Sequence, residues 1–153
     1  MQYIFYHDYR VEPADLQMYK VIIMLPLLLK FAFGVIIDSK ILSKKTYNIV
    51  ANFIVSICLF SIGFRYVDTP QAIVAIMFFS TLFHLFVDGT LQSYTLEQAR
   101  NVPCGNEDLQ SFRVVFLSLS STIGAAVATY FINIDKPRYC YIFMGCTYGL
   151  ATI

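Results

Sequence analysis

Long apolar runs separated by short polar turns constrain this chain more than any other feature. Four such runs cover residues 19–37, 47–66, 71–87 and 109–133. A helix rises about 1.5 Å per residue, so about 20 residues cross a hydrocarbon core of about 30 Å. The whole chain is 58% hydrophobic and 14% charged, whereas a soluble domain is roughly 45–50% apolar and about 25% charged. The sequence therefore predicts an integral membrane protein.

The predicted fold is all-α: a polytopic transmembrane helical bundle of about five helices, forming a single membrane domain over residues 1–153. The expected helices cover residues 16–38, 46–66, 71–97, 109–133 and 139–153. The first two are expected to form an antiparallel pair, and Pro26 predicts a kink in the first. The last stretch spans only about 22 Å if helical, so we expect the chain to stop inside a helix.

Several function classes are disfavoured by charge and motif content. The net charge is +1 and the basic residues are dispersed, so no nucleic acid partner is expected. The four cysteines form no CxxC pair and have no histidine at zinc-ligand spacing, which favours reduced thiols that fill space. No GxSxG, HExxH, P-loop or dinucleotide-binding fingerprint is present. We therefore expect no enzyme, no cofactor and no metal site.

A polar stripe runs along the third apolar helix, formed by Thr81, His84, Asp88, Gln92 and Thr95 at spacings of three and four. Such a stripe faces protein or water. Hydrogen bonds between helices, worth about 0.6 kcal/mol each, are the favoured interpretation of Thr81, Gln92 and Thr95, although Gln92 also stays a candidate substrate contact. Asp88 is different, because an isolated carboxylate in a membrane costs at least about 2.5 to 3.5 kcal/mol and typically marks a pathway, a proton relay or a counter-charge.

Two further residues accompany Asp88. His84 precedes it by one turn, and either shares a proton with Asp88, contacts a ligand, or packs as a satisfied core histidine. Lys30 lies too deep in the first helix to reach either surface and therefore requires an acidic partner or an anionic ligand. Asp88 is the natural partner, and a purely structural pair remains as plausible as a role with substrate or proton.

A second group of charges stands near one membrane face. Glu97 and Arg100 end the third predicted helix, and Arg113 lies near the start of the fourth. These residues form either a cytoplasmic charge network that takes part in gating or an ordinary solvated cluster at helix ends.

Three segments, in this order, resemble the folate-biopterin transporter family of the major facilitator superfamily. VEPADLQMYKVIIMLPLLLKFAFGVIIDS (residues 11–39) resembles the second-helix signature of the family. FVDGTLQSYTLEQAR (residues 86–100) resembles its fourth helix, in which a membrane Asp precedes a Glu-x-Ala-Arg ending. EDLQSFRVVFLSLSSTIGAAVATYF (residues 107–131) is similar to its fifth helix.

The resemblance implies a partial amino-terminal domain of a twelve-helix transporter that moves folate, biopterin or a related pteridine by alternating access. It implies that Lys30 and Asp88 line a central cavity, where they contact a small anionic pteridine-type substrate or relay a coupling proton. Gly34 and Asp38 match a motif before the cytoplasmic loop, and are expected to shape a gate. The expected partners are the lipid bilayer and the missing transporter half. The alternative is a non-transporting membrane subunit that packs against other membrane subunits in a larger complex.

Overall fold

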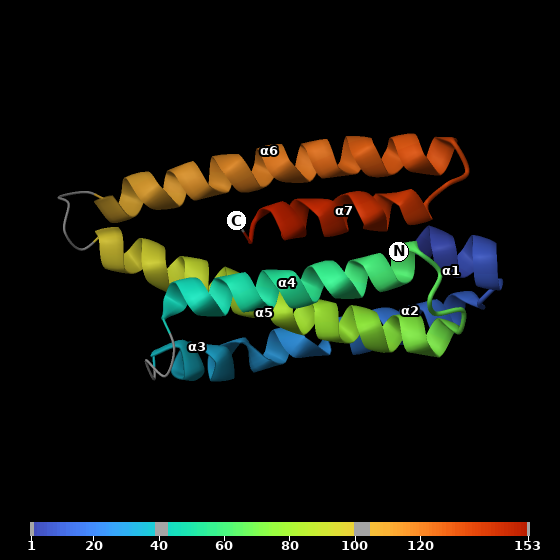
Figure 1. Ribbon diagram of the computed structural model, residues 1–153, viewed down its shortest axis with the longest axis horizontal. Helices are drawn as coiled ribbons and strands as arrows, with labels where there is room; N and C mark the ends of the chain where they lie inside the picture. The colour runs from blue at the N-terminus through green and yellow to red at the C-terminus, as the bar shows by residue number, and fades with distance from the viewer. Residues whose placement is uncertain (1, 39–42, 100–104, 153) are drawn as a thin grey trace.

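The computed structural model describes residues 2–38, 43–99 and 105–152, and every element in these ranges is helical (Figure 1). The helices are α1 (Gln2–Tyr9), α2 (Pro13–Met24), a 3-10 segment (Leu25–Leu29), α3 (Lys30–Asp38), α4 (Lys44–Gly63), α5 (Pro70–Ala99), α6 (Gly105–Asn133) and α7 (Arg138–Leu150). The predicted all-α architecture is confirmed.

Four stretches of the described chain are long and apolar enough to cross a membrane: Pro13–Val35, Lys44–Gly63, Pro70–Ala99 and Glu107–Asn133. The fifth expected helix, α7, has 13 residues, fewer than the roughly 20 that a crossing needs. The protein is a multi-pass membrane protein. Helix α1 was not expected from the sequence, because its eight residues show no apolar periodicity.

The second span ends earlier than predicted. Helix α4 stops at Gly63, whereas the apolar run continues to residue 66. Arg65 adopts a positive φ of 58°, a left-handed conformation that terminates a helix. The sequence carries no glycine at this position to announce the turn.

The predicted irregularity at Pro26 is present as the 3-10 segment between α2 and α3. Proline has no backbone N–H and cannot bond to the carbonyl four residues earlier. The carbonyl oxygen of Ile22 accepts instead from the N–H of Leu25. Helix α3 then begins at Lys30, so the break helps to set the direction in which that side chain leaves the segment.

The packed core lies between α4, α5 and α7. Buried residues of α4 and α5 form one apolar cluster: Val55, Leu59, Ile62, Ile73, Val74 and Met77. Small residues bring α7 close to α4, where the Ser56 hydroxyl donates to the carbonyl of Gly145 at 2.7 Å. A Cβ at Gly145 would lie only 3.2 Å from the Phe60 ring. The contact between α4 and α7 therefore leaves little room for a side chain at position 145.

The first span packs on α5, and so does α4. The expected pairing of the first two spans is therefore indirect: the Phe86 ring of α5 stands edge-on to both Phe33 of α3 and Tyr47 of α4, with centroids at 5.6 and 5.3 Å. Helix α6 runs along the top of Figure 1 with α7 beneath it. The residues of the α6 span are mostly exposed. The bundle thus has a packed side and an open side.

Candidate functional site

Asp88 accepts hydrogen bonds from three side chains that come from three spanning segments. Lys30 Nζ of α3 lies 3.3 Å from Asp88 Oδ2, and Gln92 Nε2 of α5 lies 2.8 Å from the same oxygen. Arg113 Nη2 of α6 donates to Oδ1. The predicted contact between Lys30 and Asp88 is present, and Arg113 is a second cation on Asp88 that the sequence does not predict. We call these four residues the Asp88 cluster.

Helix geometry explains how the cluster assembles. Gln92 follows Asp88 by four residues, so its amide lies over the carboxylate on the same face of α5. Lys30 is the first residue of α3, directly after the 3-10 segment that Pro26 imposes. Arg113 belongs to α6, which contacts α5 much less than α4 does. In the sequence Arg113 lies near the start of its helix, where a solvated charge is ordinary, so no local signal assigned it to Asp88.

The Asp88 cluster carries two positive charges and one negative charge, a surplus of one positive charge. The side chains are 41% exposed for Lys30, 29% for Asp88 and 35% for Arg113. The group is therefore accessible rather than sealed inside protein. A surplus cation in a membrane-spanning region favours an anion nearby, so the arrangement suits an anionic ligand.

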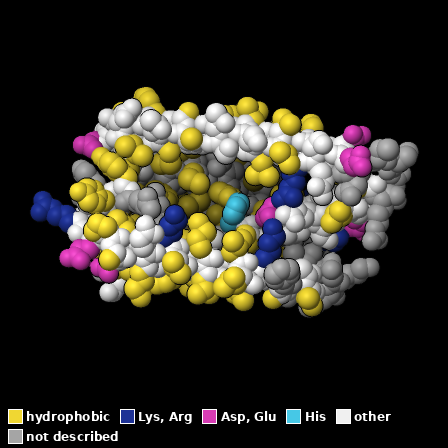
Figure 2. All heavy atoms as spheres, turned by 180° about the vertical axis from the view of Figure 1, so that it is seen from behind, with side chains coloured by type: hydrophobic (Ala, Val, Ile, Leu, Met, Phe, Trp, Pro, Cys, Tyr) yellow, Lys and Arg dark blue, Asp and Glu magenta, His cyan; other side chains and the backbone are white. Residues whose placement is uncertain are grey.

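Figure 2 shows the face on which such charges gather. That face is hollowed and hydrophobic side chains are spread over it, and Lys or Arg, acidic and histidine side chains stand together near its middle. Among the described residues, no three His, Cys, Asp or Glu side chains are grouped so that they could hold a metal ion.

His84 hydrogen-bonds toward α7. Its Nδ1 lies 2.7 Å from the Tyr148 hydroxyl, and the two rings meet edge-on with centroids 5.8 Å apart. The Thr81 and Thr95 hydroxyls donate to carbonyls of their own helix rather than across helices as predicted, because a threonine hydroxyl easily reaches the carbonyl one turn earlier. The side chains of the polar stripe therefore do not share one partner: some bond within α5 and others bond to neighbouring helices.

Two members of the charge network expected among Glu97, Arg100 and Arg113 lie in the described part of the chain. Lys44 Nζ of α4 lies 2.8 Å from Glu97 Oε2, whereas Arg113 bonds to Asp88. Arg100 lies outside the described residues.

The two predicted gate residues of α3 stand near its end. Gly34 is exposed, and a Cβ built on it would meet no atom within 4 Å. Asp38 is the last residue of α3, but its side chain lies outside the described part of the structure. Nothing in this conformation requires glycine at position 34.

A second charged cluster lies at the opposite end of the bundle, where α1 meets the turns before α5 and α7 (Figure 1). Arg138 Nε lies 2.9 Å from Asp8 Oδ2, and Arg138 Nη2 lies 3.0 Å from the Tyr9 hydroxyl. Arg65 approaches the same carboxylate at 3.8 Å. Nearby, the hydrogen bond to a carboxylate oxygen of Asp135 raises the pKa of the Tyr3 hydroxyl above its ordinary value. We call Asp8, Tyr9, Arg65 and Arg138 the Asp8 cluster.

Four apolar spans with a charged, accessible site on a hollowed face define a polytopic membrane protein with the features of a solute transporter. The model of the BT1 family matches residues 1–153. The chain therefore belongs to the BT1 family, the folate-biopterin transporter family. No curated protein and no solved structure matches the chain. The family's activity is transport of folate- or biopterin-type compounds.

Proposed function

We propose that this chain takes part in transmembrane transport of folate, biopterin or a related pteridine by alternating access, as part of a longer transporter. The observation that supports this most directly is the Asp88 cluster: a carboxylate within a spanning helix, held by Lys30 and Arg113 from two other spans. Charged residues within membrane-spanning segments are rare and typically mark substrate or ion pathways, proton relays or paired counter-charges.

In this proposal the substrate is a small anionic pteridine. A substrate carboxylate competes with Asp88 for Lys30 or Arg113, since the cluster carries one more positive than negative charge. The Gln92 amide both donates and accepts, so it suits the ring nitrogens and oxygen of a pteridine. His84 stands one turn away as a further ligand contact, oriented by Tyr148.

A coupling proton is the second role proposed for Asp88. Protonation would neutralise the carboxylate and release both cations, which raises the surplus positive charge from one to two. An anionic substrate would then bind more tightly to the protonated state than to the ionised one. The same residues thereby link proton occupancy to substrate occupancy.

The gate is proposed at the end of the bundle where α3 and α5 end and α4 and α6 begin (Figure 1). The ion pair between Lys44 and Glu97 joins the ends of α4 and α5 there. Gly34 and Asp38 approach the same end on α3, and Arg100 follows α5. Arg113 connects this end to the substrate site, because its guanidinium reaches Asp88.

The runner-up is a non-transporting membrane subunit. The exposed span of α6 favours it, because an apolar helix with little contact inside the chain offers a surface to another membrane helix. Stable co-purification with other subunits, together with absence of uptake, would support this alternative.

Uptake of radiolabelled substrates by cells that produce the full-length transporter tests the proposal. We expect Lys30→Gln to lower folate uptake about tenfold, because a hydrogen bond to a charged group contributes about 1.5–3 kcal/mol. Biopterin has no carboxylate and should lose less. Lys20→Gln is the matched control, since Lys20 is an exposed lysine of α2. Folate uptake by Lys30→Gln at the wild-type rate, with equal surface abundance, would remove Lys30 from the site.

A further inference from the structure

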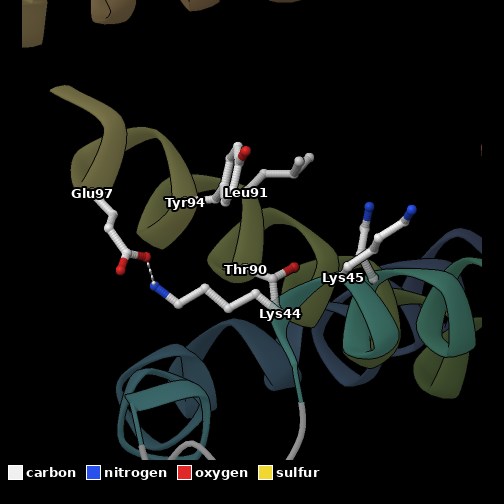
Figure 3. A pocket seen from close by; sticks show the side chains of 7 residues that line it. Lys44, Lys45, Thr90, Leu91, Tyr94 and Glu97 are labelled. Atoms are coloured by element: carbon white, nitrogen blue, oxygen red, sulfur yellow. Dashed lines mark hydrogen bonds and ion pairs between the residues drawn. The ribbon is translucent and has the colours of Figure 1, made fainter.

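A pocket lies between the start of α4 and the end of α5 (Figure 3). It shares no residue with the Asp88 cluster. Its volume is about 410 Å³. The lining residues are Lys44, Lys45, Asn48, Thr90, Leu91, Tyr94 and Glu97. Lys44 and Glu97 also form the ion pair of the proposed gate, but the gate gives no role to Lys45, Asn48 and Tyr94.

The pocket carries a surplus of one positive charge, because two lysines stand against one glutamate. Figure 3 shows Lys44 extended toward Glu97, while Lys45 points away from that pair. Lys45 is exposed, and no described residue forms an ion pair with it. Its ammonium group is therefore available to an anion that enters the pocket.

The position of these lysines in α4 adds to the argument. Both occupy the first turn of the helix, and that turn contains no acidic residue. A helix amino terminus carries about half a positive charge, so basic side chains there are unfavourable and anions are stabilised. An anion beside Lys45 would offset both the side-chain charge and the helix charge.

The surface next to the pocket identifies the kind of anion. Ile49, Phe53 and Ile57 follow Lys45 at intervals of four residues along α4. Their side chains are 37%, 57% and 50% exposed, and they lie within a candidate span. In a membrane this stripe contacts acyl chains, which places a lipid tail beside the cationic pocket.

We infer that the pocket between α4 and α5 binds the phosphate headgroup of an anionic phospholipid. Lys45 supplies the charge, and the Asn48 amide and Tyr94 hydroxyl are hydrogen-bond donors to the phosphate oxygens. The acyl chains lie along Ile49, Phe53 and Ile57. Basic pockets between membrane helices are suited to such headgroups. The inference does not depend on which solute is transported.

Binding of defined lipids to the purified full-length protein in detergent tests the inference. Phosphatidylglycerol, phosphatidylcholine and inorganic phosphate are compared by native mass spectrometry and by the shift of the apparent melting temperature. We expect tighter retention and a larger upward shift with phosphatidylglycerol than with phosphatidylcholine. Equal effects of the two lipids would overturn the inference. An equal shift with millimolar inorganic phosphate would also overturn it, in favour of a site for free phosphate.

Two substitutions change the pocket in opposite directions. Lys45→Gln should weaken phosphatidylglycerol binding about fivefold, which corresponds to about 1 kcal/mol, whereas Lys20→Gln should leave it unchanged. Glu97→Gln should strengthen binding, because it frees Lys44 from its partner. A misfolded variant does not bind more tightly, so this gain separates a charge effect from structural damage. Wild-type affinity in both pocket variants would refute the site.

Discussion

Two aspartates of this protein, Asp8 and Asp88, are each paired with basic side chains, but they lie in very different surroundings. Asp8 is bound by Arg138 in the Asp8 cluster, and Asp88 is bound by Lys30 and Arg113. The side chains of Asp8 and Arg138 are only 16% and 12% exposed, whereas those around Asp88 are 29% to 41% exposed. The pair of Asp8 and Arg138 is closed by protein, although Arg65 of the same cluster is exposed, and the Asp88 cluster is open.

Their depth differs as well. Asp8 belongs to α1, outside the four candidate spans, whereas Asp88 lies within the span Pro70–Ala99. A paired charge at the end of a helix bundle costs little, and one within a span costs several kcal/mol unless it is compensated. An ion pair by itself therefore does not identify a functional site. The proposed role of Asp88 rests on its depth together with its accessibility.

The largest expected effect comes from neutralising each aspartate in turn. Asp88→Asn leaves Lys30 and Arg113 without a counter-charge at membrane depth, and each uncompensated cation costs about 2.5–3.5 kcal/mol. We expect folate uptake per transporter to fall about a hundredfold, which corresponds to about 2.8 kcal/mol, because asparagine cannot return to the ionised form that binds an anionic substrate less tightly. Asp8→Asn should lower uptake only as far as it lowers the amount of folded protein. The measurement is initial uptake rate per transporter at the cell surface.

The comparison between the two aspartates would break down if both variants lost uptake to the same extent at equal abundance. It would also break down if Asp88→Asn kept the wild-type rate. A double variant, Lys30→Gln with Asp88→Asn, serves as the internal control for charge, because it removes one cation together with the carboxylate. Its surface abundance should exceed that of Asp88→Asn alone.

The next-largest expected effect is a loss of stability in variants of the Asp8 cluster. Arg138→Gln removes the donors to Asp8 and Tyr9, and we expect the free energy of unfolding to fall by about 2 kcal/mol, as for loss of hydrogen bonds to a charged group. Arg65→Gln is the matched control. The Arg65 side chain is 65% exposed and 3.8 Å from Asp8, so its loss should cost at most about 0.5 kcal/mol. Unfolding in mixed detergent micelles measures both, and equal losses would contradict the closed character of this cluster.

The difference between the clusters also explains which of them the sequence could predict. Asp88 and Lys30 interrupt apolar runs, so each stands out as a charge that needs a partner. The sequence therefore predicts that they pair with each other. Asp8 and Arg138 lie in polar stretches where a solvated charge is ordinary. Nothing in the local pattern joins two residues 130 positions apart. Their contact depends on how the end of α1 and the start of α7 are placed relative to each other.

The sequence also could not predict which neighbouring helix each side chain contacts. The spacing placed His84 and Asp88 on one face of α5, but a face about 100° wide can contact two neighbours. In the structure His84 bonds to Tyr148 of α7, while Asp88 meets α3 and α6. Spacing along one helix defines a stripe. Only the positions of the surrounding helices decide which partner each member of the stripe receives.

A smaller effect is expected at Gly34, and it tests whether the open side of the bundle moves. A Cβ at Gly34 meets nothing within 4 Å, and alanine favours a helix over glycine by about 1 kcal/mol. Gly34→Ala should therefore raise the free energy of unfolding by up to about 1 kcal/mol. If α3 closes against another helix during transport, uptake should fall about threefold despite the added stability. Gly124→Ala on α6, with an equally open position, is the control, and equal uptake by both variants would argue against a gate at Gly34.

The smallest expected effect concerns the hydrogen bond between Tyr148 and His84, which borders the Asp88 cluster without belonging to it. Tyr148→Phe removes the hydroxyl and keeps the ring, which stands edge-on to the histidine. We expect a loss of about 0.6 kcal/mol in the free energy of unfolding, the average for such bonds between membrane helices. Uptake should fall less than about threefold, because Asp88 keeps all three of its partners. Tyr139→Phe, at an exposed tyrosine of α7, is the control in the same unfolding and uptake assays. A loss of uptake comparable to that of Asp88→Asn would instead make His84 and Asp88 one functional unit, because the state of the histidine would then matter as much as that of the carboxylate.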